Sequence, residues 1–245
     1  MLNLLARAYL ASQEFGKGLE AAEALLQLQP KSADAWVTKG NIEYLLTRDS
    51  DSETSFRRAI QLDPKAELPR YSLGRMLYQA GRRDDALAQF ESVVRDHPAS
   101  FRAWDNIGLC HEALGRKDAA IQAYLKAISL VSKDHPSMEW PYVNLANLLL
   151  NEGEARRAFN LAVTAAERNP NSAQAFFLGG KALVKLDQPE KSLRWLRQAA
   201  QLDPNYSQPH YLLGQVLRKL GRIEESNQEY ELFKKILATQ PGERR

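Results

Sequence analysis

Residues 67–98 read ELPRYSLGRMLYQAGRRDDALAQFESVVRDHP and indicate two helices joined by a turn. Leu73 and Leu77 share one face of the first helix, because residues four apart lie one above the other. Gly81 ends that helix, since glycine adopts the left-handed conformation without steric cost. The second helix also carries its apolar residues on one face and is closed by a proline: Ala86, Phe90, Val93 and Pro98. This unit recurs along the whole chain.

The recurrence has a period of 34 residues. A proline closes each regular copy: Pro30, Pro64, Pro98, Pro170 and Pro204. The interval from Pro98 to Pro170 is 72 residues, which is two periods plus four residues, so one copy and a four-residue insertion lie between them. A fixed period in this range is typical of stacked helical repeats. With a last copy after Pro204, the chain divides into seven copies: 1–30, 31–64, 65–98, 99–136, 137–170, 171–204 and 205–240.

Small residues recur at two of the 34 positions of the unit. Positions are counted from the start of the first helix, so that position 1 is Ala33 in the second copy and Glu67 in the third. Position 8 is small in every copy: Ala6, Gly40, Gly74, Gly108, Ala146, Gly180 and Gly214. Position 20 is small as well: Gly18, Ser52, Ala86, Ala120, Ala158, Ser192 and Ser226. Two antiparallel helices can bring their backbones together only where side chains are minimal, so both positions predict helix contacts. Position 24 carries larger residues, predicted to fill the space between the helices: Phe56, Phe90, Tyr124, Leu196 and Tyr230.

Position 15 is the predicted turn between the two helices. It is glycine in four copies: Gly81, Gly115, Gly153 and Gly221. Thr47 and Asp187 depart from this pattern. The polar turn around Thr47 lacks glycine, so we expect a looser joint within the second copy.

These positions resemble the signature of the tetratricopeptide repeat family. Residues 104–108 read WDNIG and match its aromatic residue, followed by two residues, a large apolar residue and glycine. The later small, aromatic and alanine positions match as Ala120, Tyr124 and Ala127. The resemblance covers the full chain and implies an all-α fold, a right-handed α-solenoid of helix-turn-helix repeats. We therefore predict a single solenoid domain over residues 1–245, in which each copy contacts only its neighbours.

Composition argues against several classes of function. The 33 Lys and Arg residues are interleaved with 30 Asp and Glu, and a net charge of +3 without a basic stripe argues against a nucleic-acid partner. Cys110 is the single cysteine, so an intrachain disulfide is ruled out. The longest apolar run, around residues 148–150, is far shorter than the roughly 20 residues that span a bilayer. We expect no membrane insertion and a cytoplasmic location, with a lost upstream signal sequence left open.

The sequence contains no recognisable catalytic or metal-binding constellation. His97 and His135 lie in Asp-His-Pro turns, whereas His111 and His210 replace packing residues three repeats apart and cannot share a metal ion. Cys110 and His111 are adjacent on a helix and point about 100° apart, so they cannot form a catalytic dyad. We predict that the chain is not an enzyme and uses no metal and no cofactor.

The resemblance also implies a partner-binding surface. In the tetratricopeptide family, positions 2, 5, 6, 9, 12 and 13 line a concave groove that receives a partner segment. Carried over position by position, the candidate groove residues are Asn41, Tyr44, Tyr71, Arg75, Tyr78, Arg102, Asn106, Asn144, Asn147, Phe177, Lys181, Tyr211 and Arg218. Tyrosine and arginine often anchor interfaces, so we interpret Tyr71, Arg75 and Tyr78 as an exposed cluster. We predict a non-enzymatic scaffold that binds an extended or helical segment of a protein partner.

Two family subtypes bind peptides in different ways. Co-chaperones use a clamp of five residues for a terminal carboxylate. The best window here consists of Asn41, Ser72, Arg102 and Asn106, and it supplies only two of the five required residues. We therefore do not expect that mode. The asparagine ladder of O-linked N-acetylglucosamine transferase uses position 6, where this chain carries only Asn106 and Asn144. An amide can donate and accept at once, so these residues, with Asn147 one turn beyond, are interpreted as a local two-rung peptide site. Simple tolerance of asparagine at an exposed position explains them equally well.

Three alternatives stay open at this point. The insertion near residues 132–135 lengthens either a helix or a loop, and a hinge is one reading of it. No polar capping helix follows the last copy, so self-assembly into homo-oligomers through uncapped ends is an alternative function. Met1 falls at position 3, inside a helix, which fits a substrate-recruiting segment of a larger enzyme.

Overall fold

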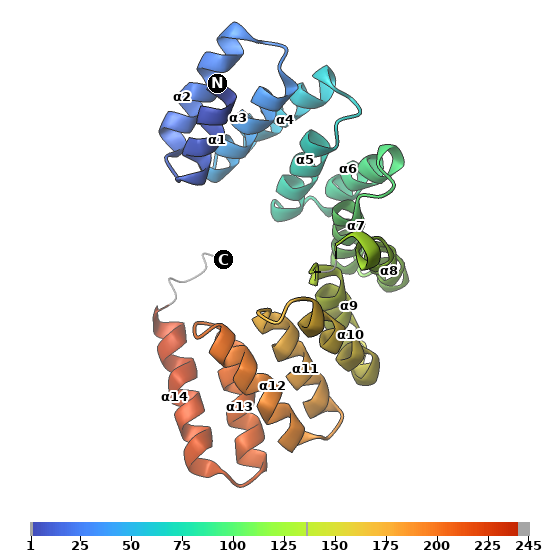
Figure 1. The fold of residues 1–245 in the computed structure, drawn as a ribbon, viewed down its shortest axis with the longest axis vertical. Coiled ribbons are helices and arrows are strands. Elements are labelled where there is room, and N and C mark those ends of the chain that lie inside the picture. Colours follow the sequence, from blue (N-terminus) through green and yellow to red (C-terminus); the bar gives the residue numbers. More distant parts are fainter. Residues whose placement is uncertain (1, 136, 240–245) are drawn as a thin grey trace. The chain divides into compact units, whose positions relative to one another are not determined.

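The computed structural model describes residues 2–135 and 137–239. This part of the chain forms fourteen α-helices: α1 Leu2–Ala11, α2 Phe15–Leu28, α3 Ala33–Leu45, α4 Asp49–Leu62, α5 Glu67–Gln79, α6 Arg83–Asp96, α7 Phe101–Ala113, α8 Lys117–Asp134, α9 Trp140–Asn151, α10 Ala155–Arg168, α11 Ala173–Lys185, α12 Pro189–Leu202, α13 Ser207–Lys219 and α14 Ile223–Thr239. Two helices correspond to each of the seven copies (Figure 1). The predicted all-α helical repeat fold is confirmed.

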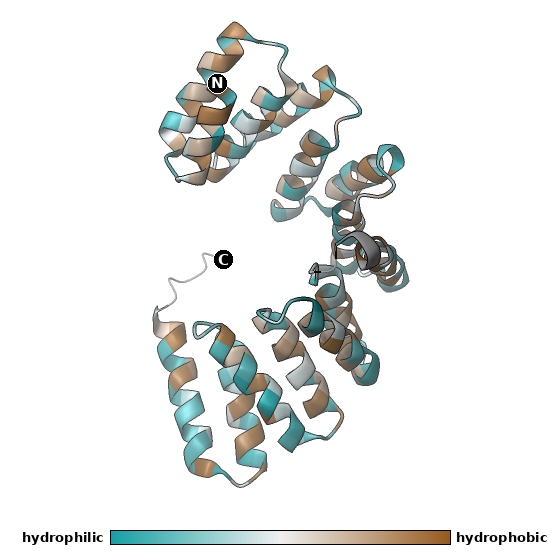
Figure 2. Cartoon of the chain, in the orientation of Figure 1, coloured by the Kyte–Doolittle hydropathy of each residue, from teal (hydrophilic) through white to brown (hydrophobic). Residues whose placement is uncertain are grey.

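Odd-numbered helices are the first helices of their copies, and even-numbered helices are the second helices. The chain divides into two compact units, residues 1–127 and 128–245, with the boundary inside α8. We call them the N-terminal unit and the C-terminal unit and describe each by itself. Hydrophobic residues lie alongside hydrophilic ones on the helices, while the connecting turns are mainly hydrophilic (Figure 2). The single domain over residues 1–245 stays a prediction.

Position 8 and position 24 meet where the two helices of a copy come closest. A methyl group added at Gly74 would lie 2.8 Å from the ring of Phe90, and one added at Gly108 would clash with the ring of Tyr124. Both rings are fully buried. The first and fifth copies use a different combination, with alanine at both positions: Ala6 with Ala22 and Ala146 with Ala162. The predicted close approach is confirmed, and the small residue is matched to the size of the residue opposite.

Position 20 is the second point of close contact. Every residue there from Ser52 onward is fully buried: Ser52, Ala86, Ala120, Ala158, Ser192 and Ser226. The Ser52 hydroxyl donates to the carbonyl of Gly40 at 2.8 Å, and the Ser226 hydroxyl donates to that of Gly214 at 2.7 Å. A buried hydroxyl without a partner costs free energy, so these bonds explain how serine is accommodated there.

Position 15 adopts the left-handed conformation in all seven copies, with or without glycine. The φ angles are +62° at Gln13, +59° at Thr47 and +54° at Asp187, against +70° to +83° at the four glycines. The next amide of the second copy, from Arg48, donates to the Glu43 carbonyl at 2.9 Å, the same length as the equivalent bond from Arg82 to Leu77. The expectation of a looser joint at Thr47 is therefore wrong, because the backbone bonds hold the turn despite its side chain.

Arg70 replaces the usual aromatic residue at position 4 and keeps its hydrogen bond. The indoles of Trp36 and Trp104 donate to the carbonyls of Pro30 and Pro98 at 3.0 and 3.1 Å. The Arg70 guanidinium donates to the Pro64 carbonyl, which holds the same place in its copy, at 3.2 Å. A planar N–H donor at this position therefore ties the first helix to the end of the preceding copy.

The four-residue insertion lengthens a helix. α8 has 18 residues, one turn more than the 14 residues of α6 and α10. Pro136, at the end of the inserted stretch, lies outside the described residues. The hinge at this place stays a prediction.

The close contact at position 8 predicts a specific cost for a single methyl group. We expect Gly74→Ala to lower the free energy of unfolding by about 1–2 kcal/mol, because the methyl group displaces the buried Phe90 ring and overpacking outweighs the helix propensity of alanine. Gly16→Ala is the matched control: no atom lies within 4 Å of its added methyl group, so stability should rise by up to about 1 kcal/mol. Urea unfolding followed by circular dichroism measures both, and equal effects of the two variants would contradict the packing argument.

The turn at Thr47 predicts the opposite result for a glycine. Thr47→Gly should raise the free energy of unfolding by about 0.5–1 kcal/mol, because a β-branched residue at positive φ is strained, and glycine's greater freedom when unfolded offsets only part of the gain. Gly81→Thr makes the reverse change in the next copy and should destabilise the chain. A thermal melt of the two variants beside the wild type tests the pair, and destabilisation by Thr47→Gly would refute the strain.

Candidate functional site

A pocket in the N-terminal unit collects three of the predicted groove residues. Asn41 and Tyr44 of α3 face Arg75 of α5 across a cavity of about 270 Å³. The remaining lining residues come from α1, α3, α4 and α5: Leu10, Leu45, Phe56, Ser72, Met76 and Gln79. Arg75 is exposed, whereas Tyr44 is half-buried and packs on the hydrophobic core of this unit. The pocket thus combines an apolar floor with an exposed cation.

Tyr71 is predicted to be exposed in the groove, but its side chain packs against neighbouring residues. Its ring is half-buried and meets the Phe90 ring edge-on, with 5.7 Å between centroids. Its hydroxyl accepts a hydrogen bond of 3.2 Å from the Asn106 amide, which also donates to the Arg102 carbonyl at 2.8 Å. Burial raises the pKa of Tyr71 above its ordinary value, although the positive charge of Arg75 opposes the shift. Tyr71 and Asn106 therefore join neighbouring first helices.

Tyr78 is held by a residue that the sequence analysis missed. The Arg83 guanidinium lies over the Tyr78 ring at 4.2 Å, a cation–π contact, and Tyr78 is half-buried. Burial raises the pKa of Tyr78, and the charge of Arg83 works against that rise. The expectation of an exposed Tyr71, Arg75 and Tyr78 cluster is corrected: Arg75 is exposed, while both tyrosines pack against the core. Arg83 is not at one of the family's groove positions, because it is the first residue of the second helix α6.

The two asparagine rungs fall in different units. Asn106 lies on α7 of the N-terminal unit, and its amide hydrogens are directed to the Tyr71 hydroxyl and the Arg102 carbonyl. Asn144 and Asn147 lie one turn apart on α9 of the C-terminal unit, and both are half-buried. The two-rung peptide site stays a prediction.

A second pocket, in the C-terminal unit, collects three more predicted residues. Phe177 and Lys181 of α11 and Tyr211 of α13 border a cavity of about 490 Å³. The other lining residues are Gln208, Leu212, Gln215 and Phe233. Phe177 is almost fully buried and forms the floor, while 45% of Tyr211 is exposed. We refer to this cavity as the aromatic pocket.

Phe233 is the residue of the aromatic pocket that sequence reasoning missed. It comes from the second helix α14, and its ring lies 5.2 Å from that of Tyr211. It occupies position 27, which carries smaller buried residues in the other copies: Leu25, Ala59, Val93, Ala127, Ala165 and Ala199. That size difference was readable in the sequence. Arg218 lies beside the pocket, over the Tyr230 ring at 5.8 Å.

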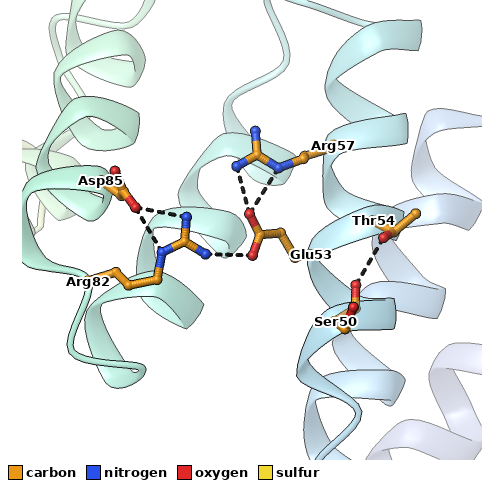
Figure 3. A network of polar contacts seen from close by, with 6 residues as sticks. All are labelled: Ser50, Glu53, Thr54, Arg57, Arg82 and Asp85. Atoms are coloured by element: carbon orange, nitrogen blue, oxygen red, sulfur yellow. Dashed lines mark hydrogen bonds and ion pairs between the residues drawn. The ribbon is translucent and has the colours of Figure 1, made fainter.

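Most ion pairs in both units involve the second helices and the turns, and Lys39 of the first helix α3 pairs with Glu43 on its own helix and with Glu23 of α2. Glu53 of α4 binds Arg57 on its own helix at 2.6 Å. It also binds Arg82, in the turn between α5 and α6, at 2.7 Å, and Arg82 in turn binds Asp85 (Figure 3). In Figure 3, the Thr54 hydroxyl donates to the Ser50 carbonyl beside this network. In contrast, within the described residues, four predicted groove cations have no carboxylate within 4.0 Å: Arg75, Arg102, Lys181 and Arg218.

The surroundings of Cys110 and the acidic residues limit the chemistry of the site. Burial raises the pKa of the Cys110 thiol to about 12, so the thiol is protonated and a poor nucleophile at neutral pH. In the described residues, no group of three or more His, Cys, Asp and Glu is placed to hold a metal ion. Apolar residues beside a cation, as in the two pockets, are features of binding sites.

Family models match most of the N-terminal unit and part of the C-terminal unit. The model described as tetratricopeptide repeat matches residues 3–67 and 71–135, which together exceed half of the chain. A second model, described as TPR repeat, matches residues 180–221. None of the helices in the described ranges has the length and apolar character that crossing a membrane requires.

Individual proteins resemble the chain at low identity. A BBSome complex member BBS4 homolog from Drosophila melanogaster is 23% identical over 202 residues, covering 80% of this chain and 40% of that protein. The human protein O-mannosyl-transferase TMTC3 is 27% identical over 156 residues, covering 59% of this chain and 17% of that protein. The solved structure of PilF from Pseudomonas aeruginosa superposes with a TM-score of 0.74 at 18% identity, covering 87% of this chain and 96% of PilF. This chain thus spans less than half the length of either sequence relative.

The Glu53 network predicts a pH-dependent contribution to stability. Partial burial alone would raise the pKa of Glu53, but hydrogen bonds and charges of Arg57 and Arg82 outweigh it and hold the pKa below its usual value. A carboxyl with a lowered pKa stabilises the fold above its unfolded pKa, about 4.3, and loses that contribution as the pH falls through its folded pKa. Glu53→Gln should therefore cost about 1 kcal/mol at pH 7 and almost nothing near pH 2.

Urea unfolding of Glu53→Gln at both pH values measures this difference. Glu231→Gln is the control, because Glu231 pairs with Lys234 on one exposed turn, where solvent screens the charges, and little change is expected at either pH. A cost for Glu53→Gln that persists at low pH would contradict the electrostatic origin.

Proposed function

This chain belongs to the tetratricopeptide repeat family, and on that premise we propose that it is a non-enzymatic scaffold whose first helices bind a segment of a partner protein. Repeats of this family generally mediate protein–protein interaction. The proposed partner segment is extended or helical and lies along the first helices. Its identity is not encoded in the fold, since one fold supports many functions.

Four cations of the first helices carry the proposal. Arg75, Arg102, Lys181 and Arg218 lie near aromatic residues and have no carboxylate within 4.0 Å among the described residues, whereas Arg57, Arg82, Arg197 and Arg222 on the second helices and turns are each paired with a carboxylate. Arginine, tyrosine and tryptophan are enriched among the few residues that dominate binding at protein interfaces. An unpaired cation beside a half-buried aromatic ring is a site where a partner's carboxylate or backbone carbonyl gains a charge-assisted hydrogen bond.

A second candidate is the substrate-recruiting segment of a larger enzyme. The observation that favours it is the similarity to the human O-mannosyl-transferase, of which this chain covers 17%. In that case, too, the first helices would bind a protein, and the bound protein would be the substrate. Association through the ends of the solenoid stays a prediction from the sequence.

Charge reversal at Arg75 tests the binding surface. Arg75 is exposed and borders the N-terminal pocket, so Arg75→Glu should leave the fold intact and reduce capture of specific partners about fivefold or more, as loss of an interface anchor does. The measurement is affinity capture from a lysate of the encoding organism with the full chain as bait, followed by quantitative mass spectrometry.

Arg58→Glu is the matched control, because Arg58 is an exposed arginine on the second helix α4 and contacts only Gln61 among its hydrogen-bond partners. It carries the same change of charge and should capture the same proteins as the wild type. Equal capture by Arg75→Glu and the wild type would show that the N-terminal pocket is not the binding surface.

A further inference from the structure

We propose that the aromatic pocket of the C-terminal unit binds a linear segment of a partner protein in which a large apolar side chain stands next to an Asp or Glu. The proposal rests on the scaffold function above and adds the chemistry of the segment. It follows from the shape of the pocket, from its charge and from the way the last copy departs from the other six.

The pocket is large enough to receive a large apolar side chain together with neighbouring atoms of a peptide, and its lining is mainly apolar. Phe177 closes its floor and meets the Tyr206 ring edge-on at 5.2 Å, so the floor is rigidly packed. Tyr211 and Phe233 both line the pocket and pack against each other, with 5.2 Å between ring centroids. The cavity of about 490 Å³ is bordered mainly by apolar surface. Filling it with an aromatic or aliphatic side chain removes that surface from water, which drives binding.

The charge at this surface is of one sign. The first helices of the C-terminal unit, α9, α11 and α13, contain no Asp or Glu but carry four cations: Lys181, Lys185, Arg218 and Lys219. Of these, Lys219 is paired with Asp187 in a turn. Lys181 borders the pocket and has no carboxylate within 4.0 Å among the described residues. A carboxylate beside the bound apolar side chain supplies the missing partner.

The acidic residues of α14 do not neutralise this surface, because three of them are already engaged. Glu225 binds Arg222 at 2.6 Å, Glu229 binds His210 at 2.7 Å and Glu231 binds Lys234 at 2.8 Å. A basic segment would therefore meet the uncompensated Lys181, whereas an acidic one would pair with it. Complementary charge of this kind also raises the rate of encounter.

The last copy differs from the others in a way that favours a peptide over a further helical pair. Position 28 is apolar in the first six copies, and Leu26 at this position packs beside Ala35 of the next copy. In the last copy it is Lys234, and position 21, mostly apolar elsewhere, is Asn227. Stacking another copy on α14 would bury this lysine, whose burial is costly. Phe233 points instead into the pocket with Tyr211.

Selection from random peptides tests the chemistry of the segment directly. A phage-displayed library of short random peptides is panned on the full-length chain, and the affinity of the enriched peptides is measured by fluorescence anisotropy. We expect the enriched sequences to carry an aromatic or aliphatic residue within two residues of an Asp or Glu. Their binding should weaken as sodium chloride is raised, because the charge contact is solvent-accessible.

Two variants and two matched controls locate the binding. Phe233→Ala and Lys181→Glu should each weaken the binding of an enriched peptide about tenfold. Leu232→Ala removes an exposed apolar residue next to Phe233, and Lys191→Glu reverses a charge on the second helix α12. Both controls should bind like the wild type, and circular dichroism checks that all four variants retain their helices.

Several outcomes would overturn the proposal. They are no enrichment, enriched peptides without acidic residues, affinities insensitive to Phe233→Ala and Lys181→Glu, and a Phe233-dependent dimer in sedimentation that competes with the peptides. The last outcome would assign the pocket to a second copy of the chain. Partner capture that depends on Arg75 but survives Lys181→Glu, together with failed peptide selection, removes this proposal and leaves the scaffold function. If partner capture does not depend on Arg75 and the peptide selection also fails, the scaffold function itself is removed.

Discussion

The close approach of two helix backbones at position 8 is the contact on which each repeat depends. Gly74 leaves room for the Phe90 ring, and where position 8 is alanine, as at Ala146, the residue opposite is alanine too. The sum of the two side chains, rather than either one, sets the separation of the helices. Because interiors are packed to high density, a change at one position is felt at the other. The register of the copies follows from repeating this match.

Many charged residues of the second helices and turns pair with one another, whereas Arg75, Arg102, Lys181 and Arg218 on the first helices have no carboxylate within 4.0 Å among the described residues. Position 15 is left-handed in every copy, and in the third copy the turn at this position brings Arg82 to Glu53 of the preceding copy. On the first helices of the C-terminal unit, Lys181 borders a pocket together with the buried ring of Phe177 and the largely exposed ring of Tyr211. A surface that leaves charges unpaired next to apolar pockets favours a partner, and this asymmetry underlies both functional proposals.

The candidate site was predictable in part. The family positions identified Asn41, Tyr44 and Arg75 around one pocket and Phe177, Lys181 and Tyr211 around the other. They did not show that Tyr71 and Tyr78 are half-buried, because the same positions face either solvent or a neighbouring copy depending on the side chains next to them. Arg83 and Phe233 were missed because both belong to second helices, and pattern-based reasoning assigned binding to first helices alone.

The sequence by itself determined the helices, their turns and the repeat, since the period of 34 residues and the small positions such as Gly74 are local and regular signals. Only the tertiary structure decided how irregular residues are accommodated. Arg70 reproduces the hydrogen bond of a tryptophan, Thr47 adopts the conformation of a glycine, and the inserted residues extend α8. The physical reason is that these outcomes depend on which atoms of another helix or copy come within bonding distance, and residue spacing along one chain does not contain that information.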